Sequence, residues 1–286
     1  MSRHYILYNP LAGGGFDSEK EEKVKKLFMG KNNAFCDITE IDYKDFFENK
    51  LVPDDTVVIV GGDGTLNRFI NDTVEFEKTN PIFYLAFGTG NDFMNDIGAD
   101  SEAPVQINKY LKDLPYCIVN GKKYLFINGI GFGIDGYCCE EGDEQRIRSP
   151  KPVNYTAIAI KGLLYKFKPL NATVTIDGVK RSYSKVWLAP TMKGRCYGGG
   201  MKPAPAQERL NSEHTLTTLI WHSSGKMRTL MAFPSIFEGG HIKYQKMCEL
   251  FTGKHILVEF DKPCALQIDG ETIRNVTRYE AFATSN

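Results

Sequence analysis

The sequence predicts an α/β protein in two parts, in which a domain built on a parallel sheet precedes a β-rich domain. In residues 1–117, short apolar runs alternate with helical patterns, and three of these runs end in glycine-rich turns. After about residue 117, short strand patterns dominate and helical patterns become rare. We therefore expect an α/β domain at 1–117 and a β-sandwich domain at 118–286, with the last residues able to pack back on the first domain.

Composition excludes several classes of protein. The 286 residues are 42% hydrophobic, which is enough for a substantial core, and the formal net charge is zero. Lys and Arg are spread along the chain, so nothing indicates a nucleic-acid partner. The seven Cys include no C-x-x-C pair, which is typical of reduced thiols in a cytoplasmic protein.

No hydrophobic run reaches the roughly 18–20 residues of a membrane span. Tyr5–Tyr8 is too short for the core of a signal peptide, and Tyr155–Tyr165, the longest candidate span, contains Lys161. Any membrane contact is therefore expected to be peripheral. The oligomeric state stays open, and a homodimer is one alternative.

The most informative stretch lies between Val57 and Asn71. Val57–Val60 is a β-branched run without polar residues, which is typical of a buried strand in a parallel sheet. Gly61–Gly64 then break the run, and the apolar spacing of the following residues predicts a helix with Thr65 as its N-cap. Such a turn lets backbone N–H groups approach a phosphate closely. Asp63 suits this site if a divalent cation such as Mg²⁺ lies between its carboxylate and the phosphates.

Two further apolar runs end in similar turns. Tyr5–Tyr8 leads into Asn9-Pro10 and Gly13–Gly15, and Ile82–Phe87 leads into Gly88–Phe93. Parallel sheets bind ligands beyond the carboxyl ends of their strands, so the three turns should meet at one edge. The residues alone thus predict one nucleotide site built from three loops.

In the second part, the strand patterns are separated by turn residues. Asp177-Gly178 predicts a hairpin, and by pattern alone Asp269-Gly270-Glu271 predicts another. A helix is expected only at Tyr155–Phe167, and the glycine segments Asn128–Gly133 and Gly198–Gly200 are expected to be loops. The candidate strands are Tyr124–Asn128, Ala172–Ile176, Tyr183–Pro190, Leu216–His222, His255–Phe260 and Cys264–Ile268.

Three motifs carry a resemblance to a known family. Asn9-Pro10 with trailing glycines, Gly61-Gly62-Asp63-Gly64-Thr65 and Gly88-Thr89-Gly90-Asn91-Asp92-Phe93 resemble the diacylglycerol kinase catalytic family, which includes bacterial soluble lipid kinases and sphingosine kinases. The resemblance covers the whole chain. It implies a Rossmann-like nucleotide domain, a β-sandwich domain facing it across a cleft, and phosphorylation of a lipid hydroxyl by ATP with Mg²⁺. The expected substrate is diacylglycerol or a related lipid alcohol at a membrane surface.

The resemblance also implies roles for individual residues. Glu271 would be the base that deprotonates the lipid hydroxyl, with help from Asp269, and Asp63 would take part in catalysis. Asp63 and Asp92 would hold the active-site Mg²⁺. The nucleotide-binding residues would be Asn9, Pro10, Gly13, Thr39, Gly61, Gly62, Asp63, Gly64, Thr65, Asn67, Gly88, Thr89 and Asn91.

The sequence departs from the family at two metal sites. An acid expected in the magnesium network is replaced by Cys117, for which Asp113 or Asp135 could substitute; a thiol is a weak partner for hydrated Mg²⁺. The structural metal site of the second domain keeps only Glu213, so we expect it to be weak or absent.

Two other functions stay open. An NAD-kinase-like enzyme would share the Gly61–Thr65 motif, and a non-catalytic nucleotide- or lipid-binding protein would explain Cys117. Arg146, Arg148 and Lys151 could contact anionic headgroups or form a solvated loop, and Lys193 and Arg195 could also contact a headgroup.

Overall fold

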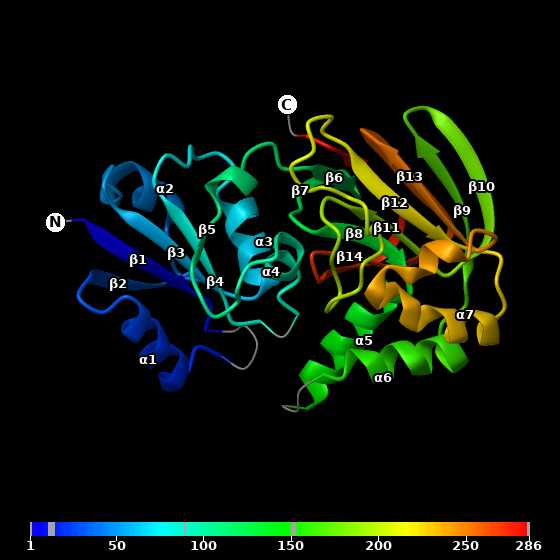
Figure 1. The fold of residues 1–286 in the computed structure, drawn as a ribbon, viewed down its shortest axis with the longest axis horizontal. Helices are drawn as coiled ribbons and strands as arrows, with labels where there is room; N and C mark the ends of the chain where they lie inside the picture. Colours follow the sequence, from blue (N-terminus) through cyan, green and yellow to red (C-terminus); the bar gives the residue numbers. More distant parts are fainter. Residues whose placement is uncertain (1, 11–14, 89, 150–152, 285–286) are drawn as a thin grey trace. The chain divides into compact units, whose positions relative to one another are not determined.

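The computed structural model describes residues 2–10, 15–88, 90–149 and 153–284. The chain divides into two compact units, Met1–Lys112 and Asp113–Asn286 (Figure 1). In the described residues, no helix is long and apolar enough to cross a membrane.

The first unit is built on a five-stranded sheet in the order β2-β1-β3-β4-β5. Its strands are β1 (Arg3–Tyr8), β2 (Asn32–Asp37), β3 (Thr56–Gly61), β4 (Ile82–Ala86) and β5 (Val105–Gln106). The first four are parallel to one another, and β5 runs antiparallel to β4. Residues Val57 to Val60 of β3 are fully buried, as expected for a central strand covered on both faces.

Helices cover both faces of this sheet. Val24 and Phe28, in and just after α1 (Ser18–Leu27), pack on Ile6 and Val58 on one face. On the other face, Tyr84 lies edge-on to Phe93 of α4 (Asp92–Ile97), with ring centroids 5.9 Å apart. The remaining helical elements are α2 (Tyr43–Asp45), the π-helix η1 (Phe46–Lys50), α3 (Asp63–Asp72) and η2 (Asn108–Tyr110).

The start of α3 differs from the sequence prediction. The N-cap is Gly62 rather than Thr65, and the helix begins at Asp63. The backbone N–H groups of Thr65 and Leu66 both donate to the Gly62 carbonyl, at 3.0 and 3.1 Å, so Thr65 already belongs to the first turn. Asp63 is therefore a helical residue of the first turn, where a carboxylate interacts favourably with the helix dipole.

The second unit is a ten-stranded, antiparallel, sandwich-like assembly. Its main order is β13-β12-β11-β8-β14-β15-β6-β7, and β9 pairs with β14 and β10. Residues from eight of these strands form one core, which includes Phe132 stacked on Phe260. The strands are β6 (Tyr116–Val119), β7 (Lys122–Leu125), β8 (Gly129–Gly133), β9 (Leu170–Ile176), β10 (Val179–Val186), β11 (Leu188–Met192), β12 (Leu216–Trp221), β13 (Cys248–Gly253), β14 (His255–Ile268) and β15 (Glu271–Phe282).

Several boundaries predicted in this unit are wrong. The glycine segment expected as a loop forms β8, a buried strand between β11 and β14. The two strands predicted at 255–260 and 264–268 are one strand, β14, whose register shifts between Glu259 and Cys264. The strand predicted at 183–190 is divided between β10 and β11. Both Asp-Gly hairpins are confirmed, because Ile176 pairs with Val179 and Ile268 with Glu271.

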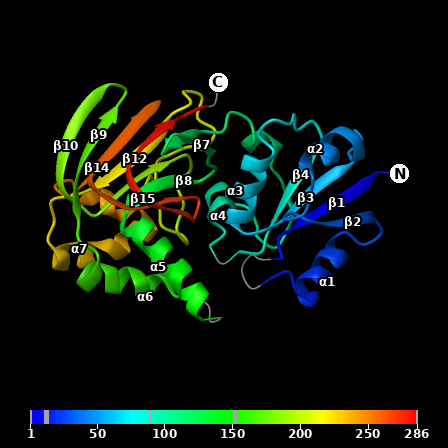
Figure 2. The ribbon, with the colours of Figure 1, turned by 180° about the vertical axis from the view of Figure 1, so that it is seen from behind.

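A helical layer covers one side of the second unit (Figures 1 and 2). It contains α5 (Ile134–Arg148), α6 (Tyr155–Lys161), the π-helix η3 (Gly162–Lys166), α7 (Lys226–Ala232), η4 (Phe233–Glu238) and η5 (Gly240–Lys243). Its apolar side chains pack on Trp187 and Trp221 of the sheet. The helix expected at 155–167 is confirmed as α6 and η3, whereas α5 and α7 were not predicted.

Candidate active site

The turns at the carboxyl edge of the first sheet lie in the order of the strands. Thr39 lies just beyond the end of β2, Asn9 follows β1, Gly62 follows β3 and Gly88 follows β4. The strand register aligns Tyr8 with Val60 and Gly61 with Ala86, so neighbouring strands end at the same level. In a sheet of this order the connections change direction between β1 and β3, which is where doubly wound folds bind ligands.

Asp63 links two of these turns. Its Oδ2 accepts a hydrogen bond from the backbone N–H of Asp92 at 2.9 Å, and its Oδ1 accepts one from that of Phe93 at 3.0 Å. The side chain at the start of α3 thus caps α4, which has no side-chain cap from its own N-cap residue, Asn91. A single carboxylate thereby fixes the Gly61–Thr65 turn against the Gly88–Phe93 turn.

Close packing explains the glycines of both turns. A Cβ atom on Gly88 would lie 2.9 Å from the Cα of Gly62, and one on Gly61 would lie 2.4 Å from Thr65 Oγ1. Gly62 has a φ of −90°, so its role is close approach and not an unusual backbone conformation.

Two buried polar atoms at these turns are available to a ligand. Thr65 Oγ1 and Asn91 Oδ1 have no hydrogen-bond partner among the described residues, although both atoms are buried. Buried polar atoms are nearly always paired, so two buried polar atoms without partners beside a glycine turn and the start of α3 fit a polar ligand. Thr65 Oγ1 can donate to a phosphate oxygen of ATP, whereas Asn91 Oδ1 is an acceptor and suits a donor or a cation.

The acidic residues at this edge fit one Mg²⁺ shared with a nucleotide. Among the described residues, no group of three His, Cys, Asp or Glu side chains could hold a metal by itself. Asp63 and Asp92 both lie near Tyr84, because burial and then these two charges raise the pKa of Tyr84 well above its usual value. The Asp92 N–H also donates to the Asp63 carboxylate. Mg²⁺ commonly takes one or two carboxylates and completes its shell with substrate phosphates and water, so two acids suffice.

The other predicted nucleotide residues are placed as follows. Thr39 donates from its backbone N–H and its hydroxyl to Asp37 Oδ1, both at 2.7 Å. Asn67 is buried on α3, where its carbonyl accepts from Asn71. Pro10 follows Asn9, and Gly64 lies within the first turn of α3. Gly13 and Thr89 lie outside the described residues.

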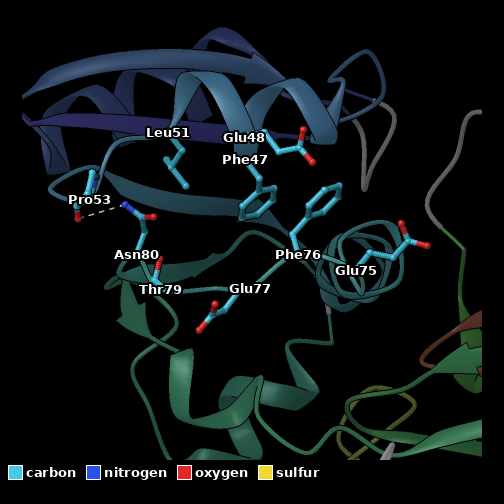
Figure 3. A pocket seen from close by; sticks show the side chains of 9 residues that line it. All are labelled: Phe47, Glu48, Leu51, Pro53, Glu75, Phe76, Glu77, Thr79 and Asn80. Carbon is cyan, nitrogen blue, oxygen red and sulfur yellow. Dashed lines mark hydrogen bonds between the residues drawn. The ribbon is translucent and has the colours of Figure 1, made fainter.

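A separate cavity of about 310 Å³ opens at the opposite edge of this sheet (Figure 3). Its wall includes Phe47 stacked on Phe76, with ring centroids 5.1 Å apart, and Asn80, whose amide donates to the Pro53 carbonyl. Pro53 and Asn80 precede β3 and β4, so this cavity lies at the amino ends of the strands. It is distinct from the nucleotide edge.

In the second unit, Asp269 anchors the hairpin that carries Glu271. Its Oδ2 accepts from the backbone N–H of Ile127 at 2.6 Å, and its Oδ1 accepts from those of Asn128 and Gly129 at 2.8 and 2.9 Å. Asp269 and Gly270 both have positive φ values, 47° and 94°, as a two-residue hairpin turn requires. The buried Asp269 carboxylate therefore holds the turn onto the segment before β8.

We expect Asp269→Asn to lower the free energy of unfolding by about 2–4 kcal/mol, because an amide has one acceptor oxygen and would turn its own donor towards a buried N–H. Chemical denaturation measures this change. Asp177→Asn is a matched control, since Asp177 begins the other Asp-Gly hairpin but its carboxylate bonds are exposed. A loss for Asp269→Asn no larger than for the control would contradict the anchoring role.

Glu271 is the first residue of β15 and is exposed. The buried anchor and the exposed carboxylate are thus two residues apart on one rigid turn. This arrangement keeps Asp269 engaged with the backbone and leaves the Glu271 side chain exposed.

A residue that the sequence did not single out supports the same segment. The buried Arg209 donates to the carbonyl of Ile127 and, at 2.9 Å, to Asn128 Oδ1. Nothing around Arg209 in the sequence indicates this contact, because the residues lie more than 80 positions apart. Asp269 and Arg209 together satisfy donors and acceptors of the segment 127–129.

The residues considered for the missing acid have different surroundings. Cys117 lies in the sandwich core on β6, and burial raises the pKa of its thiol. Asp113 is exposed before β6. Asp135 lies in the first turn of α5, where Oδ2 accepts from the Tyr197 hydroxyl at 3.2 Å and Oδ1 has no partner among the described residues. A Cβ on Gly131 would lie 2.2 Å from Asp135 Oδ2, so this glycine makes room for the carboxyl.

Burial raises the pKa of Asp135 from 3.8 to about 6, against smaller lowering effects of hydrogen bonds. A carboxyl whose pKa is raised on folding stabilises the protein below its unfolded pKa and loses that contribution as pH rises through about 6. The native chain should therefore lose about 2 kcal/mol of stability between pH 4 and pH 7, and Asp135→Asn should abolish this loss. Denaturation at several pH values measures it, with Asp143→Asn on the same helix as control. Parallel pH profiles of the native chain and Asp135→Asn would contradict this expectation.

Glu213 lies in an exposed turn that is closed by an amide side chain. Asn211 Nδ2 donates to the carbonyls of Glu208 and Thr215, and its Oδ1 accepts from Thr215 N. Asn211 and its hydrogen bonds thus stand in the turn where the family resemblance implies acidic metal ligands.

Comparisons with known proteins agree with this architecture. A model of the diacylglycerol kinase catalytic domain matches residues 3–115, and one of the YegS C-terminal NAD kinase beta sandwich-like domain matches residues 128–281, which is more than half of the chain. The chain belongs to the diacylglycerol kinase catalytic-domain family. This confirms the resemblance on which the sequence prediction rests, and the two-part fold is confirmed with it.

Individual relatives of the family are distant. "Putative lipid kinase YtlR" of Bacillus subtilis is 23% identical over 72% of this chain and 73% of its own length. A diacylglycerol kinase of Bacillus subtilis is 23% identical over 95% of this chain and 90% of its own length. The solved structure of a "putative diacylglycerol kinase" from Bacillus anthracis superposes with a TM-score of 0.69 at 19% identity, covering 98% of this chain and 92% of that one. At this identity the solved structure supports the fold alone.

Proposed function

We propose that this chain is an ATP- and Mg²⁺-dependent lipid kinase that transfers the γ-phosphate to a lipid hydroxyl, with diacylglycerol or a related lipid alcohol as acceptor. The observation that carries the proposal is the Asp63 carboxylate, which ties the two motif turns together at the carboxyl edge of a parallel sheet. Membership of the family supports the reaction class, and proteins named diacylglycerol kinase occur among the relatives.

The first unit would bind the nucleotide through its turns. Backbone N–H groups at the start of α3, with the Thr65 hydroxyl, would orient the phosphates. Asp63 and Asp92 would hold Mg²⁺, directly or through water, and the hydrogen bond from the Asp92 N–H to the Asp63 carboxylate supports this pairing. Bound Mg²⁺ and ATP supply the phosphoryl group and the neutralisation of its charge.

Glu271 would act as the base. An alkyl hydroxyl is a poor nucleophile at neutral pH, and a carboxylate that accepts its proton as the new bond to phosphorus forms contributes about 10²–10⁴ in rate. Asp269 would position Glu271 through the hairpin turn instead of exchanging the proton itself, because its oxygens are engaged by three backbone N–H groups.

The test is to incubate the protein with a total lipid extract, Mg²⁺ and ATP labelled in its γ-phosphate, and to identify which lipid gains phosphate. Individual diacylglycerol, monoacylglycerol, ceramide and sphingoid bases follow. Absence of transfer to every lipid would contradict the proposal. Formation of NADP from NAD and ATP would instead support the NAD-kinase-like alternative, which shares the sandwich type named in the second family match.

A non-catalytic role is the second alternative, and the core position of Cys117 is the observation that favours it. Nucleotide binding without turnover, measured by calorimetry on the same preparation, would support that alternative. Large activation by Cys117→Asp would show that the natural chain is an impaired enzyme.

A further inference from the structure

Three helical elements of the second unit expose large apolar side chains. Ile160 and Tyr165, in α6 and η3, are 46% and 73% exposed, and Met227 and Met231, in α7, are 64% and 72% exposed. Met227 and Met231 are four residues apart and therefore share one helix face. Large apolar side chains gathered on a surface often mark a site of interaction.

These side chains belong to adjoining elements. α7 packs against η3, and Lys226 Nζ at the start of α7 donates to the Leu164 carbonyl of η3 at 3.2 Å. α6 continues directly into η3 and packs on α5 within the helical layer (Figure 1). We call this surface the α6–α7 face and define it by Ile160, Lys161, Tyr165, Lys166, Lys168, Lys226, Met227, Arg228 and Met231.

The charge of the α6–α7 face has one sign. Residues 155–168 and 226–232, which hold α6, η3 and α7, contain five Lys and Arg, all exposed, and no Asp or Glu, although the whole chain has a formal net charge of zero. The neighbouring end of α5 differs, because Arg146 pairs with Asp143 and Arg148 with Glu144 on the same helix. Lys151, the third basic residue considered there, lies outside the described residues.

We propose that the α6–α7 face docks the protein on an anionic membrane. The apolar side chains would enter the headgroup region, while the lysines reach the anionic lipids along their flexible stems. Each Lys or Arg near such a surface strengthens binding by about fivefold. The proposal rests on the proposed lipid kinase function, since a lipid substrate brings the protein to a bilayer.

Vesicle sedimentation without ATP tests the docking face. The native protein should bind vesicles of phosphatidylcholine with phosphatidylglycerol more tightly than vesicles of phosphatidylcholine alone, and added salt should weaken this binding. The double variant Met227→Glu/Met231→Glu should bind at least about tenfold more weakly, because it removes apolar insertion and adds repulsion. The variant Lys161→Gln/Lys166→Gln should lose binding without any change in apolar surface.

Met29→Glu provides the matched control, since Met29 is 81% exposed on the first unit and lies outside the α6–α7 face. It should bind vesicles as the native chain does. Thermal unfolding of each variant confirms that the fold is intact.

Three outcomes would overturn the docking proposal: no binding by the native protein, equal binding by the native protein and the Met227→Glu/Met231→Glu variant, or loss of self-association in that variant with vesicle binding retained. The last would make the face an interface between copies of the chain. Vesicle binding that behaves as expected, together with no lipid phosphorylation, would leave the docking proposal standing and contradict the kinase proposal alone.

Discussion

Replacing Glu271 with glutamine is expected to lower kcat for lipid phosphorylation by about 10²–10⁴, with little change in ATP affinity or in the free energy of unfolding. Glutamine keeps the size of the side chain and removes its ability to accept a proton. Glu271 is exposed at the start of β15, so the fold does not depend on burying its carboxylate. Steady-state kinetics with the lipid identified in the labelling experiment, together with ATP binding by calorimetry, measure the separate effects.

Glu238→Gln is a suitable control, since it removes an exposed carboxylate at the end of η4 in the second unit, and it should leave kcat within about twofold. Asp269→Asn gives a second comparison. It should lose stability and activity together, whereas Glu271→Gln should lose activity alone. If Glu271→Gln retained more than about a tenth of the native kcat, Glu271 would not be the general base.

The order of elements in the first unit was predictable because strong local patterns coincide there with tertiary burial. The apolar side chains of Val57 to Val60 can be buried on both faces only if these residues form a central strand, and the glycines that follow mark the turn. The N-cap was misplaced by three residues because Thr65 has the better capping side chain, whereas packing against Gly88 selects glycine at position 62. Close backbone approach between distant turns leaves no signal in a single sequence.

The second unit was harder to predict for a different reason. The alternating glycines of β8 are typical of a loop, yet they are required because Met192, Asp135 and the Trp187 carbonyl occupy the space that side chains at Gly129, Gly131 and Gly133 would need. The helix α5 was missed because its acidic residues, two adjacent cysteines and two glycines form no apolar stripe.

The candidate site also has a part that the sequence predicts and a part that it does not. The motifs located the Gly61–Thr65 and Gly88–Phe93 turns, because the residue types themselves imply phosphate chemistry. They could not show that Asp63 bonds to the backbone of α4 or that Asp269 bonds to that of residues 127–129, since both contacts depend on tertiary structure. The roles of Asp63, Asp92 and Glu271 in catalysis stay predictions.

Asp63→Asn is expected to have two measurable effects with separate causes. An asparagine offers one acceptor oxygen to the two N–H groups of Asp92 and Phe93, so the free energy of unfolding should fall by about 1–3 kcal/mol even without Mg²⁺ and ATP. The lost charge at the proposed Mg²⁺ site should lower kcat/KM by about 10²–10³ more than the unfolded fraction explains. Denaturation curves and kinetics over a range of Mg²⁺ concentrations separate the two effects.

Asp72→Asn is the matched control, because Asp72 is the last residue of the same helix and forms an exposed ion pair with Arg68 at 3.2 Å. Its stability should change by less than about 0.5 kcal/mol and its activity should not change. If the activity lost by Asp63→Asn equals its unfolded fraction and the Mg²⁺ dependence is native, Asp63 is a helix cap alone. A weaker apparent Mg²⁺ affinity in the folded variant would show that the carboxylate which joins α3 to α4 also serves the metal, since a pure cap has no reason to alter that affinity.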